Sequence, residues 1–137
     1  MKCYACRGTR FEMRPIEIDL RVGEHTVVSR GHRRPVCLAC GEYTITSQML
    51  EIAELQSAVV AFTEAPRVSG GMLQFGRKAL GFTQTDLAQR IGSTKESISR
   101  WEREERPMEP WVPLTVLALL RERLMPPPKD IEFKRAG

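Results

Sequence analysis

The chain has 137 residues, with 21 lysines and arginines against 17 aspartates and glutamates, which gives a formal net charge of +4. The whole excess lies beyond residue 65, where 13 basic residues stand against 9 acidic ones, because residues 1–65 carry 8 of each. No run of about 20 apolar residues is present to cross a bilayer, and the amino terminus lacks the pattern of a secretory signal. We therefore expect a cytoplasmic protein with a polyanionic partner and no membrane partner.

The first 64 residues predict a small β-hairpin followed by a helix. Residues 16–22 alternate apolar and charged side chains, which is the period of a strand with one buried face. Gly23 and Glu24 predict the turn, residues 26–29 the returning strand, and residues 33–36 a third strand. Helical spacing then starts at Ser47, the predicted N-cap. The apolar face of that helix is predicted to hold Met49, Ile52, Ala53, Val59, Val60 and Phe62.

Four cysteines form two Cys-x-x-Cys pairs, Cys3 with Cys6 and Cys37 with Cys40, on either side of this hairpin. Each pair predicts a tight turn that points two thiolates at one centre, and four thiolates complete the closed tetrahedral shell of one structural zinc ion. Metal binding can supply folding free energy directly, which a half-chain with one hairpin and one helix needs because its core is thin.

Other interpretations of these cysteines are a rubredoxin-like iron site, a redox-active pair of the thioredoxin type, or a catalytic zinc. Thioredoxin-like chemistry expects a βαβ context that this sequence lacks, and a catalytic zinc keeps one position open for water, whereas four thiolates leave none. His25 and His32 are interpreted as surface residues, because the cysteines already complete the shell.

The sequence predicts an α+β protein that divides near residue 70. Pro66 ends the first helix, and the two glycines that follow it at positions 70 and 71 bend at little cost. The predicted parts are a zinc-binding domain (1–64), a linker (65–71), an all-α helix-turn-helix domain for DNA binding and dimerisation (72–124), and a poorly ordered tail (125–137).

The carboxy-terminal half predicts a helix-turn-helix motif. A capping box of Thr83 and Asp86 starts one helix, Gly92 ends it, and Ser93 or Thr94 caps the next. Two helices joined by a turn of three or four residues that contains glycine have the layout of this DNA-binding motif.

The predicted packing leaves one face of the second helix free for double-stranded DNA. In the major groove an arginine can donate two hydrogen bonds to a guanine edge. We predict that Arg100 reads bases first, followed by Lys95 and Glu96. Phosphate contacts are predicted for Gln84, Thr94 and Ser99. On the last helix, a weak homodimer interface is predicted at Leu114, Leu117 and Leu124.

Residues 80–88 (LGFTQTDLA), Gly92 and residues 98–102 (ISRWE) resemble the Cro/repressor (Xre) family of helix-turn-helix domains. With MKCxxC at the start and PVCxxCGE upstream, the order of motifs resembles MqsA-type antitoxins, whose amino domain is also called a YgiT-type zinc finger. This resemblance reaches to about Leu124. It implies one structural zinc on the four cysteines, a ribonuclease toxin as partner of the amino domain, and a dimer that represses its own operon at a palindrome.

The same resemblance makes Arg100 a base-reading arginine, whereas Glu96 stands where such an antitoxin offers an asparagine. Gly76 occupies a helix position where the wider family prefers an apolar residue, at a cost of about 1 kcal/mol unless another backbone packs closely there. Glu104 stands where the family usually ends the recognition helix with glycine, which predicts a different helix end or a strained left-handed residue.

Three hypotheses for function follow. The first is an antitoxin that represses its own operon, and the second is a stand-alone zinc-finger regulator without a toxin. The third is a redox- or metal-responsive regulator, which predicts exposed and activated thiolates. No base, nucleophile or open metal site is arranged for catalysis, so an enzyme is not expected.

Overall fold

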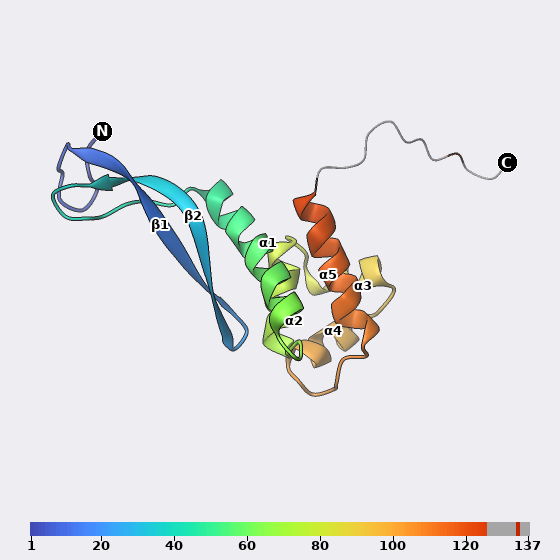
Figure 1. The fold of residues 1–137 in the computed structure, drawn as a ribbon. Coiled ribbons are helices and arrows are strands. Elements are labelled where there is room, and N and C mark those ends of the chain that lie inside the picture. The colour runs from blue at the N-terminus through green and yellow to red at the C-terminus, as the bar shows by residue number, and fades with distance from the viewer. Residues whose placement is uncertain (126–133, 135–137) are drawn as a thin grey trace.

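The computed structural model describes residues 1–125 and Lys134, and it has the predicted α+β architecture. A long antiparallel hairpin of β1 (Phe11–Val22) and β2 (His25–Cys37) precedes a group of helices (Figure 1). The helices are α1 (Ser47–Glu64), α2 (Gly70–Ala79), α3 (Gln84–Ile91), α4 (Lys95–Glu102) and α5 (Trp111–Leu124). None of these described helices is long and apolar enough to cross a membrane. The predicted tail lies outside the described residues except for Met125 and Lys134.

The hairpin turns at Gly23 and Glu24, as the sequence predicts, and Gly23 has the left-handed φ of 63° that such a tight turn requires. The predicted third strand is wrong, because residues 33–36 continue β2 and pair with residues 12–15 of β1. Near Ile16 the register shifts, and Gly31, with a φ of 87°, accommodates an extra residue of β2. This bulge lets one strand run from the turn to the second cysteine pair.

The tip of the hairpin is fixed to the amino end of α2. The Glu24 carboxylate accepts a hydrogen bond of 2.6 Å from the Ser69 hydroxyl, and Ser69 in turn caps α2 by accepting from the Met72 amide at 3.2 Å. A methyl group on Gly23 would stand 2.9 Å from the backbone nitrogen of Met72, so the turn approaches α2 as closely as glycine allows. Val22 is fully buried beside this contact and belongs to the core of the helices.

Helix α1 lies between the hairpin and the other helices (Figure 1). Its N-cap is Thr46 rather than the predicted Ser47, since the Thr46 hydroxyl accepts from the Met49 amide at 3.1 Å. The predicted apolar face is wrong in part, because Ile52 and Val60 are 50% and 49% exposed. The buried residues of α1 are Ala53, Leu55, Ser57, Ala58, Ala61 and Phe62. Packing on two sides explains the difference, since small residues let α1 approach both neighbours.

One hydrophobic core is shared by all five helices and the tip of the hairpin. Gly76 is part of it, and a Cβ there would stand 3.1 Å from the ring of Phe62. The aromatic ring of α1 therefore fills the place of the missing side chain, where the sequence led us to expect a close backbone. Because α2 starts at Gly70 with Ser69 as its cap, only residues 65–69 separate α1 from α2. The predicted domain boundary concerns which parts fold by themselves, and it stays a prediction.

The end of α4 lies against the start of α2. Glu104 has a φ of 59°, which confirms the left-handed residue expected at this helix end. Its carboxylate accepts hydrogen bonds from the Gly70 amide at 2.7 Å and from Arg67 at 2.8 Å, and these contacts hold the pKa of Glu104 below its usual range. A Cβ on Gly70 would lie 2.6 Å from the carbonyl oxygen of Trp101, so glycine is required by the approach of α4.

Replacing Gly70 with alanine is expected to lower the free energy of unfolding by about 2 to 3 kcal/mol, because the new methyl group meets backbone oxygens that cannot move independently. Gly76→Ala is the matched control in the same helix. Its methyl group meets a ring that can shift, and a gain of about 1 kcal/mol in helix propensity offsets the tight contact. Urea unfolding followed by circular dichroism measures both variants, and equal losses would contradict the prediction.

Candidate metal centre and nucleic-acid interface

The four cysteines come together at the end of the hairpin away from the helices (Figure 1). Their sulfur atoms all lie within 4.8 Å of one another, and the Cys3–Cys40 and Cys6–Cys37 pairs are each 3.6 Å apart. A tetrahedral ion with sulfur ligands at about 2.3 Å has sulfur–sulfur edges of about 3.8 Å. The cluster therefore has the size needed to hold one tetrahedral metal ion.

The backbone builds the same tight turn at both cysteine pairs. The Cys3 carbonyl accepts from the Arg7 amide, and the Cys37 carbonyl accepts from the Gly41 amide, each at 2.8 Å. Arg7 and Gly41 both have left-handed backbones, with φ values of 63° and 81°. A Cβ on Gly8 would lie 3.2 Å from the sulfur atoms of Cys6 and Cys37, so the chain passes close behind the cluster.

The electrostatics of the cluster favour a bound cation. Amide hydrogen bonds from Cys6 and Ala5 lower the pKa of the Cys3 thiol to about 7. The Glu42 amide acts in the same direction on Cys40, but burial and the neighbouring thiols outweigh it and raise the pKa of Cys40 to about 12. Thiols this close compete for ionisation, whereas a metal ion stabilises four thiolates together.

Helices α3 and α4 form the predicted helix-turn-helix. Thr83 and Asp86 make the capping box, with the Thr83 amide donating to the Asp86 carboxylate at 2.9 Å and the Asp86 amide donating to the Thr83 hydroxyl at 3.0 Å. Gly92 ends α3 with a φ of 74°, and Thr94, rather than Ser93, caps α4. Local hydrogen bonds therefore set both the length of the turn and the start of the second helix.

The outer face of α4 carries the residues predicted to read DNA. Lys95, Glu96 and Arg100 are exposed and Ser99 is half-buried, whereas Ile98 and Trp101 point into the core. Within residues 1–125 no carboxylate lies at ion-pair distance from Lys95 or Arg100. Both cations are therefore available to a polyanion, and the interpretation of Arg100 as half of a surface ion pair gains no support.

The two other predicted phosphate ligands also make contacts within the protein. The Thr94 hydroxyl accepts from the Ser97 amide as the cap of α4 and donates to the Ser97 hydroxyl. The side-chain amide of Gln84 donates to the Glu102 carboxylate at 3.2 Å, which fixes its direction at the start of α3. Their predicted contacts with phosphate stay predictions.

A buried ion pair that the sequence analysis missed connects α2 to α4. Arg77 donates to both carboxylate oxygens of Glu102, at 2.7 and 3.0 Å, and also to the Phe82 carbonyl at 2.9 Å. The two side chains are only 9% and 4% exposed. Arg77 stands on the same face of α2 as Leu73 and Gly76, both buried. A charged residue at an apolar spacing was the signal in the sequence that pointed to a buried pair.

Comparison with known proteins identifies the same segment. Residues 73–109, which run from α2 to the loop after α4, match a family model described as helix-turn-helix. No curated protein matches the chain. The segment is thus a helix-turn-helix module of the Cro/repressor (Xre) kind, as predicted, and the protein carries the DNA-binding module of a transcriptional regulator.

Breaking the buried pair is expected to be costly. Arg77→Met leaves the Glu102 carboxylate buried without a partner, at a cost of about 3 to 5 kcal/mol in the free energy of unfolding. The double variant Arg77→Met/Glu102→Leu should recover most of this loss, because no buried charge remains. Urea unfolding of the two single variants and the double variant checks this, and simple additivity of the single losses would show that the two charges are not coupled.

Removing the metal is expected to loosen the hairpin end and leave the helices folded. The shared core contains none of the four cysteines, so its apolar contacts do not depend on the metal. Circular dichroism before and after addition of a chelator should show an almost unchanged helical signal, while thiol-reactive dye should label the cysteines faster. A helical signal that collapses with the metal would show instead that the two parts unfold as one unit.

Proposed function

We propose that this protein is a sequence-specific transcriptional repressor that binds a palindromic operator in double-stranded DNA as a homodimer. The free cationic face of α4, on a helix-turn-helix whose second helix is anchored by Glu102, is the observation that carries this proposal. In this proposal Arg100 reads a guanine edge, Lys95 and Glu96 contact neighbouring bases, and the phosphates are bound by Gln84, Thr94 and Ser99.

The cysteine cluster is proposed to hold one structural zinc ion. Four thiolates at tetrahedral spacing are the closed shell typical of structural zinc, and soft sulfur ligands select this metal over harder cations. The ion would hold the two turns of Cys3–Cys6 and Cys37–Cys40 together, and so would fix the end of a hairpin that has few apolar contacts of its own.

We further propose that the repressor is the antitoxin of a type II toxin–antitoxin pair, and that the zinc end of the hairpin binds a ribonuclease toxin. Large apolar side chains are exposed at this end. They are Met1 (80%), Tyr4 (70%), Met13 (51%), Leu38 (47%) and Ile45 (39%). Tyr4 and Leu38 occupy the same position in the two cysteine turns, so they project from one end of the arm. Exposed apolar groups gathered in one place are typical of a protein-binding surface.

The proposed dimer uses α5. Leu114 is 68% exposed on this helix, whereas Leu117 and Leu124 are half-buried and also pack against the core. An exposed leucine beside half-buried ones offers an apolar strip to a second copy, and a two-fold dimer would place two α4 helices on successive turns of a palindrome.

A redox- or metal-responsive regulator is the second candidate. Cys6 and Cys40 are exposed, which leaves half of the cluster open to oxidants. Reversible loss of DNA binding under mild oxidant would favour this candidate, and binding that resists oxidant would favour a purely structural site. A stand-alone regulator without a toxin uses the same residues, and the toxin experiment below separates it from an antitoxin.

Arg100→Ala is expected to weaken binding to the DNA upstream of its own gene by about 1 to 3 kcal/mol and to change binding to random DNA little, because a base contact carries specificity. Arg121→Ala, an exposed arginine of α5, is the matched control and should bind both DNAs as the wild type does. Fluorescence anisotropy measures all three proteins. Equal losses of Arg100→Ala on the two DNAs would show that Arg100 touches only phosphate.

Expression of the small reading frame adjacent to this gene is expected to arrest growth, and co-expression of this protein should rescue it through a complex that co-purifies. Tyr4→Asp should abolish the rescue and keep DNA binding, because it puts a charge in the proposed toxin surface. Ile52→Asp, at an apolar and half-exposed position of α1, is the control. Arrest without rescue, or no arrest at all, would leave a repressor whose partner is DNA alone.

A further inference from the structure

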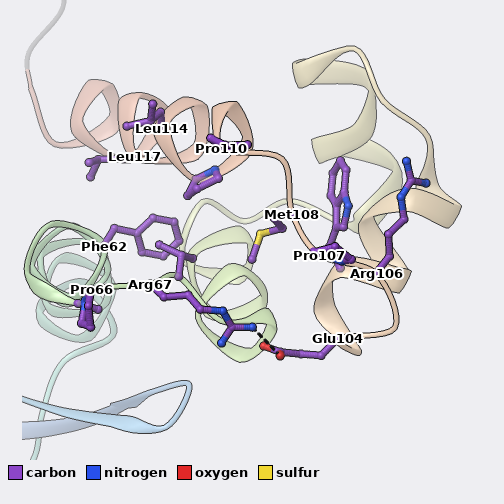
Figure 2. A pocket seen from close by; sticks show the side chains of 14 residues that line it. Phe62, Pro66, Arg67, Glu104, Arg106, Pro107, Met108, Pro110, Leu114 and Leu117 are labelled. Carbon is purple, nitrogen blue, oxygen red and sulfur yellow. Dashed lines mark hydrogen bonds and ion pairs between the residues drawn. The ribbon is translucent and has the colours of Figure 1, made fainter.

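A cleft of about 700 Å³ lies between the connection that follows α1, the loop that follows α4, and the first turns of α5 (Figure 2). Phe62, Met108 and Leu117 contribute apolar side chains, and four prolines add rigid apolar walls. Pockets that bind small molecules have volumes of about 300 to 1,000 Å³ and a mostly apolar lining with a few polar groups. This cleft has the size and lining of a ligand site.

The charged side chains around the cleft favour an anion. Arg67 and Arg106 line it, against the single carboxylate of Glu104. That carboxylate is already neutralised, because it binds Arg67 and the Gly70 amide, and Figure 2 draws the ion pair with Arg67. Arg106 is held more loosely, with a contact of 4.0 Å to Glu109. An anion in the cleft would therefore meet a cation whose present partner is weak.

The cleft also contains a hydrogen-bond donor with no acceptor. Trp101 lines it and is 2% exposed, and its indole nitrogen has no hydrogen-bond partner among the described residues. Trp111 meets Trp101 edge to face, with the ring centroids 6.4 Å apart, but an aromatic face is a weak acceptor. Leaving a buried donor unsatisfied costs about 1 to 3 kcal/mol. A ligand oxygen settling against Trp101 would remove this cost.

The walls of the cleft are held in place before anything binds. Pro66, Pro107 and Pro110 restrict the two connecting segments, and the contact of Glu104 with Gly70 ties the end of α4 to α2. A preformed cleft binds its ligand without the cost of ordering a loop.

We propose that this cleft binds a small amphipathic carboxylate, with its apolar body between Phe62 and Leu117, and its carboxylate shared between Trp101 and Arg106. Trp101 directly follows Arg100 in α4, so the occupant contacts the helix that presents the cations to DNA. A change in operator affinity on binding rests on the proposed function, whereas the binding itself does not. The test is therefore made on the full chain without DNA.

Isothermal titration calorimetry with decanoate, an apolar chain that ends in a carboxylate, is expected to show one site per chain. Decyltrimethylammonium has a chain of the same length and the opposite charge, and should bind at least about tenfold more weakly. Equal binding of the two probes, or no binding of decanoate, would overturn the proposal, because the cleft would then offer only apolar surface or none.

Two variants locate the site. Trp101→Phe keeps the ring and removes the donor, and the loss of one hydrogen bond to a charged group predicts about a tenfold weaker affinity for decanoate. Arg106→Glu reverses an exposed charge and should weaken binding at least as much, whereas Arg121→Glu, outside the lining, is the matched control. Circular dichroism verifies that each variant is folded. Decanoate affinity unchanged in both cleft variants would place the probe elsewhere and overturn the proposal.

A second copy of the chain is the competing occupant. Light scattering on the same samples separates the two, because a ligand site is expected to take up decanoate whatever the oligomeric state. A wild-type dimer that takes up no decanoate, together with an Arg106→Glu variant that is monomeric, would assign the cleft to the dimer interface and overturn the ligand proposal.

Discussion

The buried pair of Arg77 and Glu102 sets the position of the recognition helix. Two charges at 9% and 4% exposure are stable only when each finds its partner in good geometry, and here the arginine donates to both carboxylate oxygens and to the Phe82 carbonyl. Glu102 also orients Gln84 at the start of α3. One ion pair thus holds three helices in a fixed relation, because any other relation would leave a buried charge unpaired. The outer face of α4 depends on it for its direction.

The amino end of α2 is the second point on which the arrangement depends, and it receives contacts from both directions of the chain. Glu24 reaches Ser69 from the tip of the hairpin, and Glu104 reaches Gly70 from the end of α4. A helix start offers free amide donors and a partial positive charge, so two carboxylates are favourable neighbours there. The arm that carries the cysteines and the helix that faces DNA are therefore fixed to the same turn of α2.

Residues that depart from the usual family pattern are compensated by their neighbours. Gly76 leaves a gap that the ring of Phe62 fills, and this lets α1 join the core of the helix-turn-helix. Glu104 accepts a left-handed backbone, which an ordinary residue resists, and in return its carboxylate binds the start of α2. Arg7 adopts the left-handed backbone that Gly41 adopts in the second cysteine turn. In the first two cases a tertiary contact replaces a preference that the local sequence violates.

The sequence by itself determined the features that depend on a few neighbouring residues. The spacing of the cysteines indicated a four-thiolate cluster, and the capping box of Thr83 with Gly92 defined the helix-turn-helix, because these signals act within one turn of the backbone. Contacts between distant segments were decided only by the tertiary structure. The strand bulge at Gly31, the choice of Ala58 over Ile52 for the buried face of α1, and the pairing of Arg77 with Glu102 each depend on what another element presents. A single sequence gives the composition of each surface, but not the surface it meets, and that meeting sets the energy of burial.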